Sequence, residues 1–104
     1  MKKIVSKYNN FVKRKEMEKW CKLHLNNGYT INDDYTIDSQ KSVNLYGVDY
    51  IPYKFNTVNG SFLVNGSNIT NFNNFPYECD MIDISGTKIT SLDGLPRCNT
   101  LYIS

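Results

Sequence analysis

Three cysteines and one histidine are the residues of this 104-residue chain best suited to metal or nucleophilic chemistry. The cysteines, Cys21, Cys79 and Cys98, are odd in number, and no Cys-x-x-Cys pair occurs. This spacing supports neither a disulfide framework nor a zinc knuckle. We therefore expect the cysteines to be small buried side chains in a reducing compartment. His24 stands in the last turn of a predicted helix, where a cation suits the helix dipole.

Acidic residues that could serve in catalysis gather in one short stretch. Asp33, Asp34 and Asp38 lie in or beside a predicted hairpin turn, without a basic or nucleophilic residue at a fixed spacing. General acid–base or covalent catalysis needs such a partner within hydrogen-bond reach. The sequence also lacks the phosphate-binding loop, the His-Glu-x-x-His helix and the Gly-x-Ser-x-Gly elbow. We therefore expect no enzymatic activity, no cofactor and no metal site.

Basic residues are concentrated at the start of the chain. Residues 1–24 carry eight Lys or Arg against two Glu, whereas residues 25–104 carry four against eight acidic residues. A basic helix can bind nucleic acid, or it can dock as a solvated face on a mildly acidic body. We favour docking, because the tyrosines are not interleaved with the basic residues as a stacking platform requires. The alternative, nucleic-acid binding, would use Lys2, Lys3, Lys13, Arg14, Lys15, Lys19 and Lys22.

Length and hydropathy point to one small domain. The chain contains no apolar run of 18 residues that could span a membrane. Its first seven residues are too polar and too short for the apolar part of a signal peptide. We therefore expect a soluble, cytoplasmic protein that makes no contact with a membrane.

The second half of the chain repeats itself with a shift of 20 residues. Residues 61–76 align with residues 81–96 so that apolar positions coincide throughout. The matched pairs are Phe62 with Ile82, Val64 with Ile84, Ile69 with Ile89, Phe72 with Leu92 and Phe75 with Leu95. Gly66, Thr70 and Pro76 meet identical residues at the same shift. Such a period indicates an architecture of stacked repeats.

Each repeat begins with an apolar-x-apolar triplet, which is typical of a short strand with two inward side chains. Related triplets begin at residues 43, 62, 82 and 101, with spacings of 19, 20 and 19. The glycine that follows the first three triplets allows a sharp turn with positive φ. One coil cannot bury its own apolar face, so stacked coils would bury a continuous column beneath a parallel sheet.

The N-terminal part of the chain is expected to cover the first coil. Residues 3–25 show helical periodicity in two apolar stripes that are out of phase. This pattern leaves open whether one helix forms or two, over residues 2–9 and 10–25. Trp20 is the expected anchor of the cap, because it is the largest side chain of the second stripe.

A β-hairpin is predicted directly after this helix. Residues 29–31 and 35–37 read as short strands, and they flank the acidic turn of residues 32–34. Asn26, Asn27 and Gly28 form the stop signal that separates the hairpin from the helix. Helix and hairpin together would shield the apolar end of the first coil from water.

Taken together, the triplets, the Asn/Gly turns and the cap-like segment resemble the short-repeat leucine-rich proteins of bacteriophages and some bacteria. The resemblance covers roughly residues 16–104. It implies a single α+β domain in which a leucine-rich-repeat solenoid carries a parallel β-sheet. The expected parts are a helical cap over residues 1–28, a hairpin and linker over 29–41, and about three coils over 42–104.

The resemblance implies a non-enzymatic protein that binds other proteins. In the phage setting it would be a small accessory protein that binds and inhibits a bacterial host protein, for instance one of antiviral defence. In such solenoids the outward side chains of the strands line an exposed sheet face, where a partner would bind. Leu63 and Tyr102 could instead pack only on each other. The expected partner-binding residues are Asn44, Tyr46, Leu63, Asn65, Asp83, Ser85 and Tyr102.

The last predicted strand has an open edge in this sequence. The apolar column beneath it would be partly exposed at Leu92 and Leu95, and also within the strand itself. We expect a second copy of the chain or a different protein to cover this edge; the alternative is that the edge frays. The contact would use Leu101, Tyr102, Ile103 and Ser104.

Overall fold

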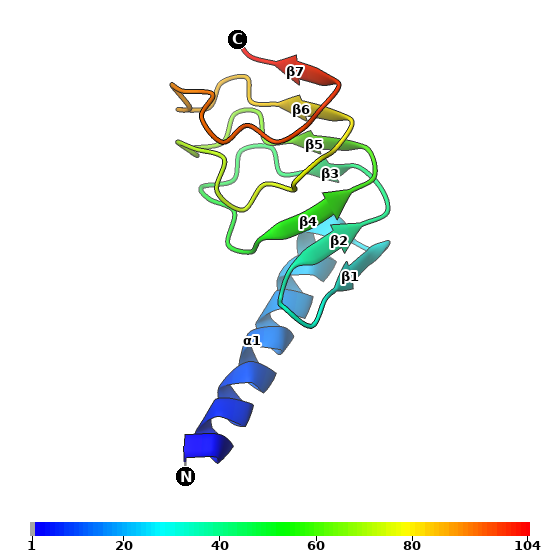
Figure 1. Cartoon of the computed structure of the whole chain (residues 1–104), viewed down its shortest axis with the longest axis vertical. Helices are drawn as coiled ribbons and strands as arrows, with labels where there is room; N and C mark the ends of the chain where they lie inside the picture. Colours follow the sequence, from blue (N-terminus) through cyan, green and yellow to red (C-terminus); the bar gives the residue numbers. More distant parts are fainter. Residues whose placement is uncertain (1) are drawn as a thin grey trace.

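One helix and seven short strands form the chain in a computed structural model, which describes residues 2–104 and their side chains from residue 10 onward. The elements are α1 (Lys2–Leu25), β1 (Tyr29–Ile31), β2 (Ile37–Ser39), β3 (Val43–Asn44), β4 (Phe55–Val58), β5 (Ser61–Leu63), β6 (Met81–Asp83) and β7 (Thr100–Tyr102). The strands make two sheets, ordered β1-β2-β4 and β3-β5-β6-β7. Figure 1 shows α1 at one end of an elongated α+β molecule that measures 51 by 26 by 22 Å.

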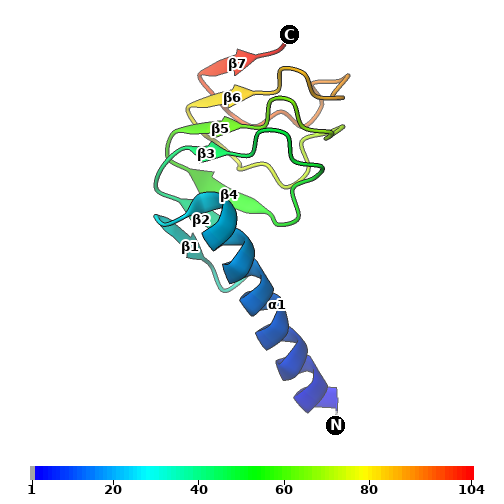
Figure 2. The same cartoon turned by 180° about the vertical axis from the view of Figure 1, so that it is seen from behind.

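Helix α1 runs without a break through Asn9 and Asn10, so the structure has the one-helix alternative. An asparagine in a helix interior costs less than about 1 kcal/mol, whereas a second helix would need its own unfavourable nucleus. The helix ends where Asn26 and Gly28 take positive φ angles of 67° and 76°. Figure 2 shows its first turns extending away from the sheets.

The last turns of α1 are held by one apolar stripe. Met17, Cys21 and Leu25 follow one another at intervals of four residues, and all three are buried. Trp20 lies beside them, half-buried, and packs edge-on against the Phe55 ring with the centroids 6.1 Å apart. The prediction that Trp20 anchors the cap is therefore confirmed.

The hairpin is present, but its second strand begins later than expected. Strands β1 and β2 pair antiparallel, with Ile31 opposite Ile37. Tyr35, the expected start of the second strand, instead has φ of 63° in the loop. The Asp34 carboxylate accepts hydrogen bonds from the Thr36 N–H (3.1 Å) and hydroxyl (2.6 Å), and this local turn holds the loop open through residue 36.

Strand β4 was not predicted from the sequence. It pairs parallel with β2, so that β2 is bonded to β1 on one side and to β4 on the other. Isolated parallel bridges from Thr57 to Glu78 and from Glu78 to Arg97 continue this ladder into the later repeats. The chain therefore forms two ladders, and each repeat contributes to both.

Strands β3, β5, β6 and β7 form a sheet that is parallel throughout. Its register pairs Val43 with Phe62, Phe62 with Ile82, and Ile82 with Leu101. These are the residues at which the sequence triplets begin, so the expected parallel order and register are confirmed. The three later strands start one residue before their triplets, at Ser61, Met81 and Thr100.

A column of aromatic side chains fills the space between the two ladders. Phe62 packs on Phe55 and Phe75 with ring centroids 5.1 and 4.9 Å apart, and Phe75 packs in turn on Phe72 at 5.1 Å. All four phenylalanines are buried. Burial weakens towards β7, where Leu92 is 50% exposed. Each apolar layer needs a neighbour on both sides, and the last described layer has only one.

Candidate binding surface on the parallel sheet

The four residues expected to form a row across the sheet do lie side by side. The register pairs Asn44 with Leu63, Leu63 with Asp83, and Asp83 with Tyr102. Asn44 and Tyr102 are exposed, whereas Leu63 and Asp83 are half-buried between their neighbours. The row therefore presents two polar, one aliphatic and one aromatic side chain, in steps of about 4.8 Å.

A second row lies where the strands turn. Gly47, Gly66 and Gly86 donate their N–H groups to the carbonyls of Asn65, Ser85 and Ser104, at 3.2, 2.8 and 3.1 Å. These bonds align the expected surface residues Tyr46, Asn65 and Ser85 with Ser104 at the edge. Tyr46 is 69% exposed, and Asn65 and Ser85 are half-buried.

Two side chains of the first row are used by their own backbone. The Asn44 Oδ1 atom accepts the Tyr46 N–H at 3.0 Å, and the Asp83 Oδ1 atom accepts the Ser85 N–H at 2.9 Å. Each bond closes a local turn at the end of a strand. The second oxygen of Asp83 and the amide nitrogen of Asn44 have no hydrogen-bond partner among the described residues, and can therefore serve a ligand.

The Tyr46 ring packs against Gly66, which has no side chain. A Cβ atom built on Gly66 would lie 3.0 Å from the Cε2 atom of Tyr46, so the tyrosine ring rests over the glycine. Gly66 also has φ of 71°, which L side chains rarely adopt. Gly66 therefore allows the chain to turn and leaves room for the Tyr46 ring.

Sequence reasoning missed a third row on this sheet. Ser61, Met81 and Thr100 are paired in register, two residues before the first row. Ser61 and Met81 are half-buried and Thr100 is exposed. The signal was the two-residue alternation of a strand, extended one residue before each apolar triplet. Met81 adds a flexible apolar side chain next to Asp83 on the sheet.

The expected edge contact lies at the open side of β7. Tyr102 and Ile103 are 54% and 57% exposed, Ser104 is exposed, and Leu101 is half-buried. A hollow of about 360 Å³ adjoins the edge; its lining includes Ile84, Ile89, Leu92 and Ile103. The expectation that the apolar column is partly exposed here is confirmed for the described residues.

The basic helix contacts the hairpin with two of its cations. The Arg14 guanidinium donates hydrogen bonds to the carbonyls of Ile31 (2.8 Å) and Asn32 (3.4 Å). The Lys13 ammonium lies 4.4 Å from the centre of the Tyr35 ring. Lys15, Lys19 and Lys22 are exposed, and Lys2 and Lys3 lie outside the described side chains.

The acidic residues near the hairpin have structural partners. Asp38 accepts bonds from the Asn56 amide (2.9 Å), the Asn32 amide (3.2 Å) and the Thr57 hydroxyl (2.7 Å). Burial pushes the pKa of Asp38 upward, but these hydrogen bonds outweigh it, and the pKa lies below its ordinary value. The hydrogen bonds from Thr36 lower the pKa of Asp34 in the same way. The His24 ring packs against the Trp20 ring at an angle of 37°, with the centroids 4.7 Å apart.

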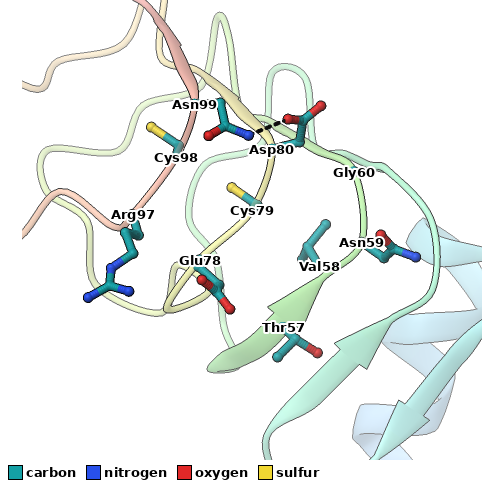
Figure 3. A pocket seen from close by; sticks show the side chains of 10 residues that line it. All are labelled: Thr57, Val58, Asn59, Gly60, Glu78, Cys79, Asp80, Arg97, Cys98 and Asn99. Atoms are coloured by element: carbon teal, nitrogen blue, oxygen red, sulfur yellow. Dashed lines mark hydrogen bonds between the residues drawn. The ribbon is translucent and has the colours of Figure 1, made fainter.

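The three cysteines differ in their surroundings. Cys21 is buried in the helix contact, as expected, whereas Cys79 and Cys98 are only half-buried. The expectation of burial is therefore wrong for these two, because they lie near the less covered end of the stack. Figure 3 shows both lining a hollow of about 450 Å³ together with Glu78, Asp80 and Arg97. Burial raises the pKa of Cys79 to about 11, and the nearby Cys98 and Asp80 act in the same direction.

No protein-family model, curated protein or solved structure matches the chain. Within residues 2–104 no helix is long and apolar enough to cross a membrane.

Proposed function

We propose that the chain is a short leucine-rich-repeat solenoid that acts as a non-enzymatic protein-binding module. The solenoid assignment is supported by parallel strands whose paired residues are 19 or 20 positions apart and by positive-φ glycines at 47, 66 and 86. The second ladder, through Thr57, Glu78 and Arg97, supports it as well, because each repeat then returns along the opposite side of a shared core.

The observation that carries the binding proposal is the in-register row Asn44, Leu63, Asp83 and Tyr102, flanked by Tyr46. Tyrosine combines a large rigid contact area with a hydrogen-bonding group, and it is enriched where protein interfaces gain most of their affinity. The row is held by sheet hydrogen bonds and local turns, so a partner would find it already ordered. Binding then costs little conformational entropy on this side.

For the partner we propose a bacterial host protein, which the chain binds and inhibits as a phage-type accessory protein. The resemblance to phage leucine-rich proteins supports this setting. A partner surface complementary to the row would have an apolar pocket for Leu63 or Tyr102. It would also have a hydrogen-bond donor for the second carboxylate oxygen of Asp83.

A capture experiment with two matched double variants tests this function. The immobilised chain is exposed to bacterial lysate, next to Leu63→Asp combined with Tyr102→Asp. The control combines Leu23→Asp with Tyr50→Asp, which change the same residue types at sites 79% and 69% exposed and away from the row. We expect a partner that is bound by the unchanged chain and the control and is lost from the row variant.

Circular dichroism of all three proteins establishes that they are folded before capture. A row variant that retains every captured partner would place the binding site elsewhere. Loss of the partner from the control as well would show that the row is not responsible for the selectivity.

A further inference from the structure

Cys79 and Cys98 occupy equivalent positions in neighbouring repeats. Glu78 and Arg97, the residues just before them, form a parallel bridge. The Cys79 N–H donates to the Arg97 carbonyl at 3.0 Å, and the Asn99 N–H donates to the Asp80 carbonyl at 2.9 Å. Hydrogen bonds on both sides of the pair therefore fix the two cysteines in register, at the ladder spacing of about 4.8 Å.

The two thiols share one accessible hollow. In Figure 3 the side chains of Cys79 and Cys98 point the same way, and both residues line a hollow of about 450 Å³. Both are half-buried and pack against the hydrophobic core. Glu78, Asp80 and Arg97 also line this hollow. The Cys79 thiol makes only a weak contact, 3.7 Å to the Met81 carbonyl.

Parallel side chains keep their sulfur atoms near the spacing of the backbone. A disulfide bond of about 2.05 Å would require both side chains to turn towards each other. A zinc–thiolate bond is about 2.3 Å long, so two metal–thiolate bonds of that order placed in line span about 4.6 Å. This span is close to the ladder spacing of about 4.8 Å. Soft thiolate ligands select Cu⁺ over harder ions.

Among the residues that the structure describes, no group of three or more His, Cys, Asp or Glu side chains is placed to hold a metal ion. We propose that Cys79 and Cys98 form a two-coordinate site for one soft monovalent metal ion of the Cu⁺ type. Two thiols and one Cu⁺ give a thiolate–copper–thiolate unit of charge −1 and release two protons to solvent, without any change of oxidation state. The bound ion joins the last two repeats at their least buried end.

A competition titration tests the site. The full-length chain, reduced and free of oxygen, is titrated with Cu⁺ in the presence of the chelator bicinchoninate. The variants are Cys79→Val and Cys98→Val; valine is the residue at the equivalent place in the preceding repeat, Val58, so both should fold. The control is Cys21→Val, which removes the third thiol but leaves the pair.

We expect one Cu⁺ per chain in the unchanged protein and in the Cys21 control. Each single variant of the pair should bind at least about 100-fold more weakly, because the second thiol acts at high effective concentration. Cu⁺ should also raise the melting temperature of the first two proteins and not of the pair variants, since an ion that binds only the folded state stabilises it.

Unchanged Cu⁺ affinity in Cys98→Val or Cys79→Val would overturn the proposal, as would loss of binding in the Cys21 control alone. Mass spectrometry of the titrated protein supplies an independent readout. An intrachain disulfide between Cys79 and Cys98 in place of a copper adduct would refute the metal assignment.

Discussion

Single polar residues decide how the hairpin joins the repeats. Asp38 is the middle residue of the hairpin strand β2. Its carboxylate accepts hydrogen bonds from Asn56 and Thr57 of β4, the next strand of the same sheet. Asn32 completes the set from the hairpin loop. A carboxylate that accepts several hydrogen bonds is stabilised in its charged form, so Asp38 links cap and repeat more strongly when it is ionised.

We predict that stability depends on pH through Asp38. Its folded-state pKa is lowered below the ordinary value of 3.8, so its contribution is present above that value and is lost as pH falls through the folded pKa. Asp38→Asn should lower the free energy of unfolding by about 1–2 kcal/mol at neutral pH. Urea denaturation between pH 7 and about pH 2 measures this difference, which should shrink as the carboxylate is protonated.

Asp33→Asn is the control for this prediction, because Asp33 is exposed in the same hairpin loop. It should leave stability nearly unchanged over the whole range. A difference between the unchanged chain and Asp38→Asn that stays constant down to pH 2 would show that ionisation of Asp38 does not stabilise the fold.

Among the secondary-structure elements, the N-terminal helix α1 packs against the hairpin. Its buried stripe covers the first layer of the core, and Arg14 adds charged hydrogen bonds to the carbonyls at the outer end of β1. The Ile31 carbonyl lies at the edge of the three-stranded sheet, where an unpaired group would otherwise face water or another strand. The Asn32 carbonyl also accepts the Tyr35 N–H at 3.0 Å. The contacts of Lys13 and Arg14 favour docking as the role of the basic residues.

Arg14→Ala should therefore act on stability. We expect a loss of about 1–2 kcal/mol in the free energy of unfolding, because the hydrogen bonds to Ile31 and Asn32 are removed. Lys19→Ala, an exposed cation on the same helix, should have almost no effect. Thermal or urea unfolding of the three proteins measures the difference.

The same variants address nucleic-acid binding, the alternative function. We expect no electrophoretic shift with DNA or RNA at about 50 mM salt for any of the three proteins. Binding that weakens steeply with salt and falls equally in Arg14→Ala and Lys19→Ala would assign the helix to nucleic acid instead.

At the scale of the whole molecule, burial is unequal along the stack of repeats. The phenylalanine column is fully covered near the cap, whereas Leu92, Ile103 and Tyr102 are at least half exposed at the other end. A stack whose layers contact only their neighbours loses stability first at the layer with one neighbour. We expect the β7 end to open more readily than the β3 end.

Hydrogen exchange of three equivalent amides tests this gradient. Leu45, Val64 and Ile84 donate to the carbonyls of Leu63, Asp83 and Tyr102, at 2.7, 3.0 and 2.9 Å. The Ile84 amide should exchange fastest, because its acceptor lies on the edge strand. Equal rates for the three amides would mean that the stack opens only as one cooperative unit.

The period of the fold follows from the amino-acid sequence alone. Apolar side chains that recur every 19 or 20 residues, with a glycine after the first three sets, predict parallel strands in one register, because a slip by one residue would turn the apolar side chains to the solvent face. The row from Asn44 to Tyr102 follows from the same register. The outward-facing residues of this row can be located from the two-residue alternation of a strand alone.

Two features do not follow from the period and depend on how the segments pack in space: strand β4 and the pairing of two cysteines. Strand β4 exists because β2 offers it a partner and Asp38 fixes the contact, and no local pattern encodes either. The sequence does contain a signal for the pairing of Cys79 and Cys98, because the two are one repeat apart. A search for a local Cys-x-x-Cys motif does not detect this separation. Pairing across repeats depends on how the layers stack, and stacking is a property of the assembled core and not of any single segment.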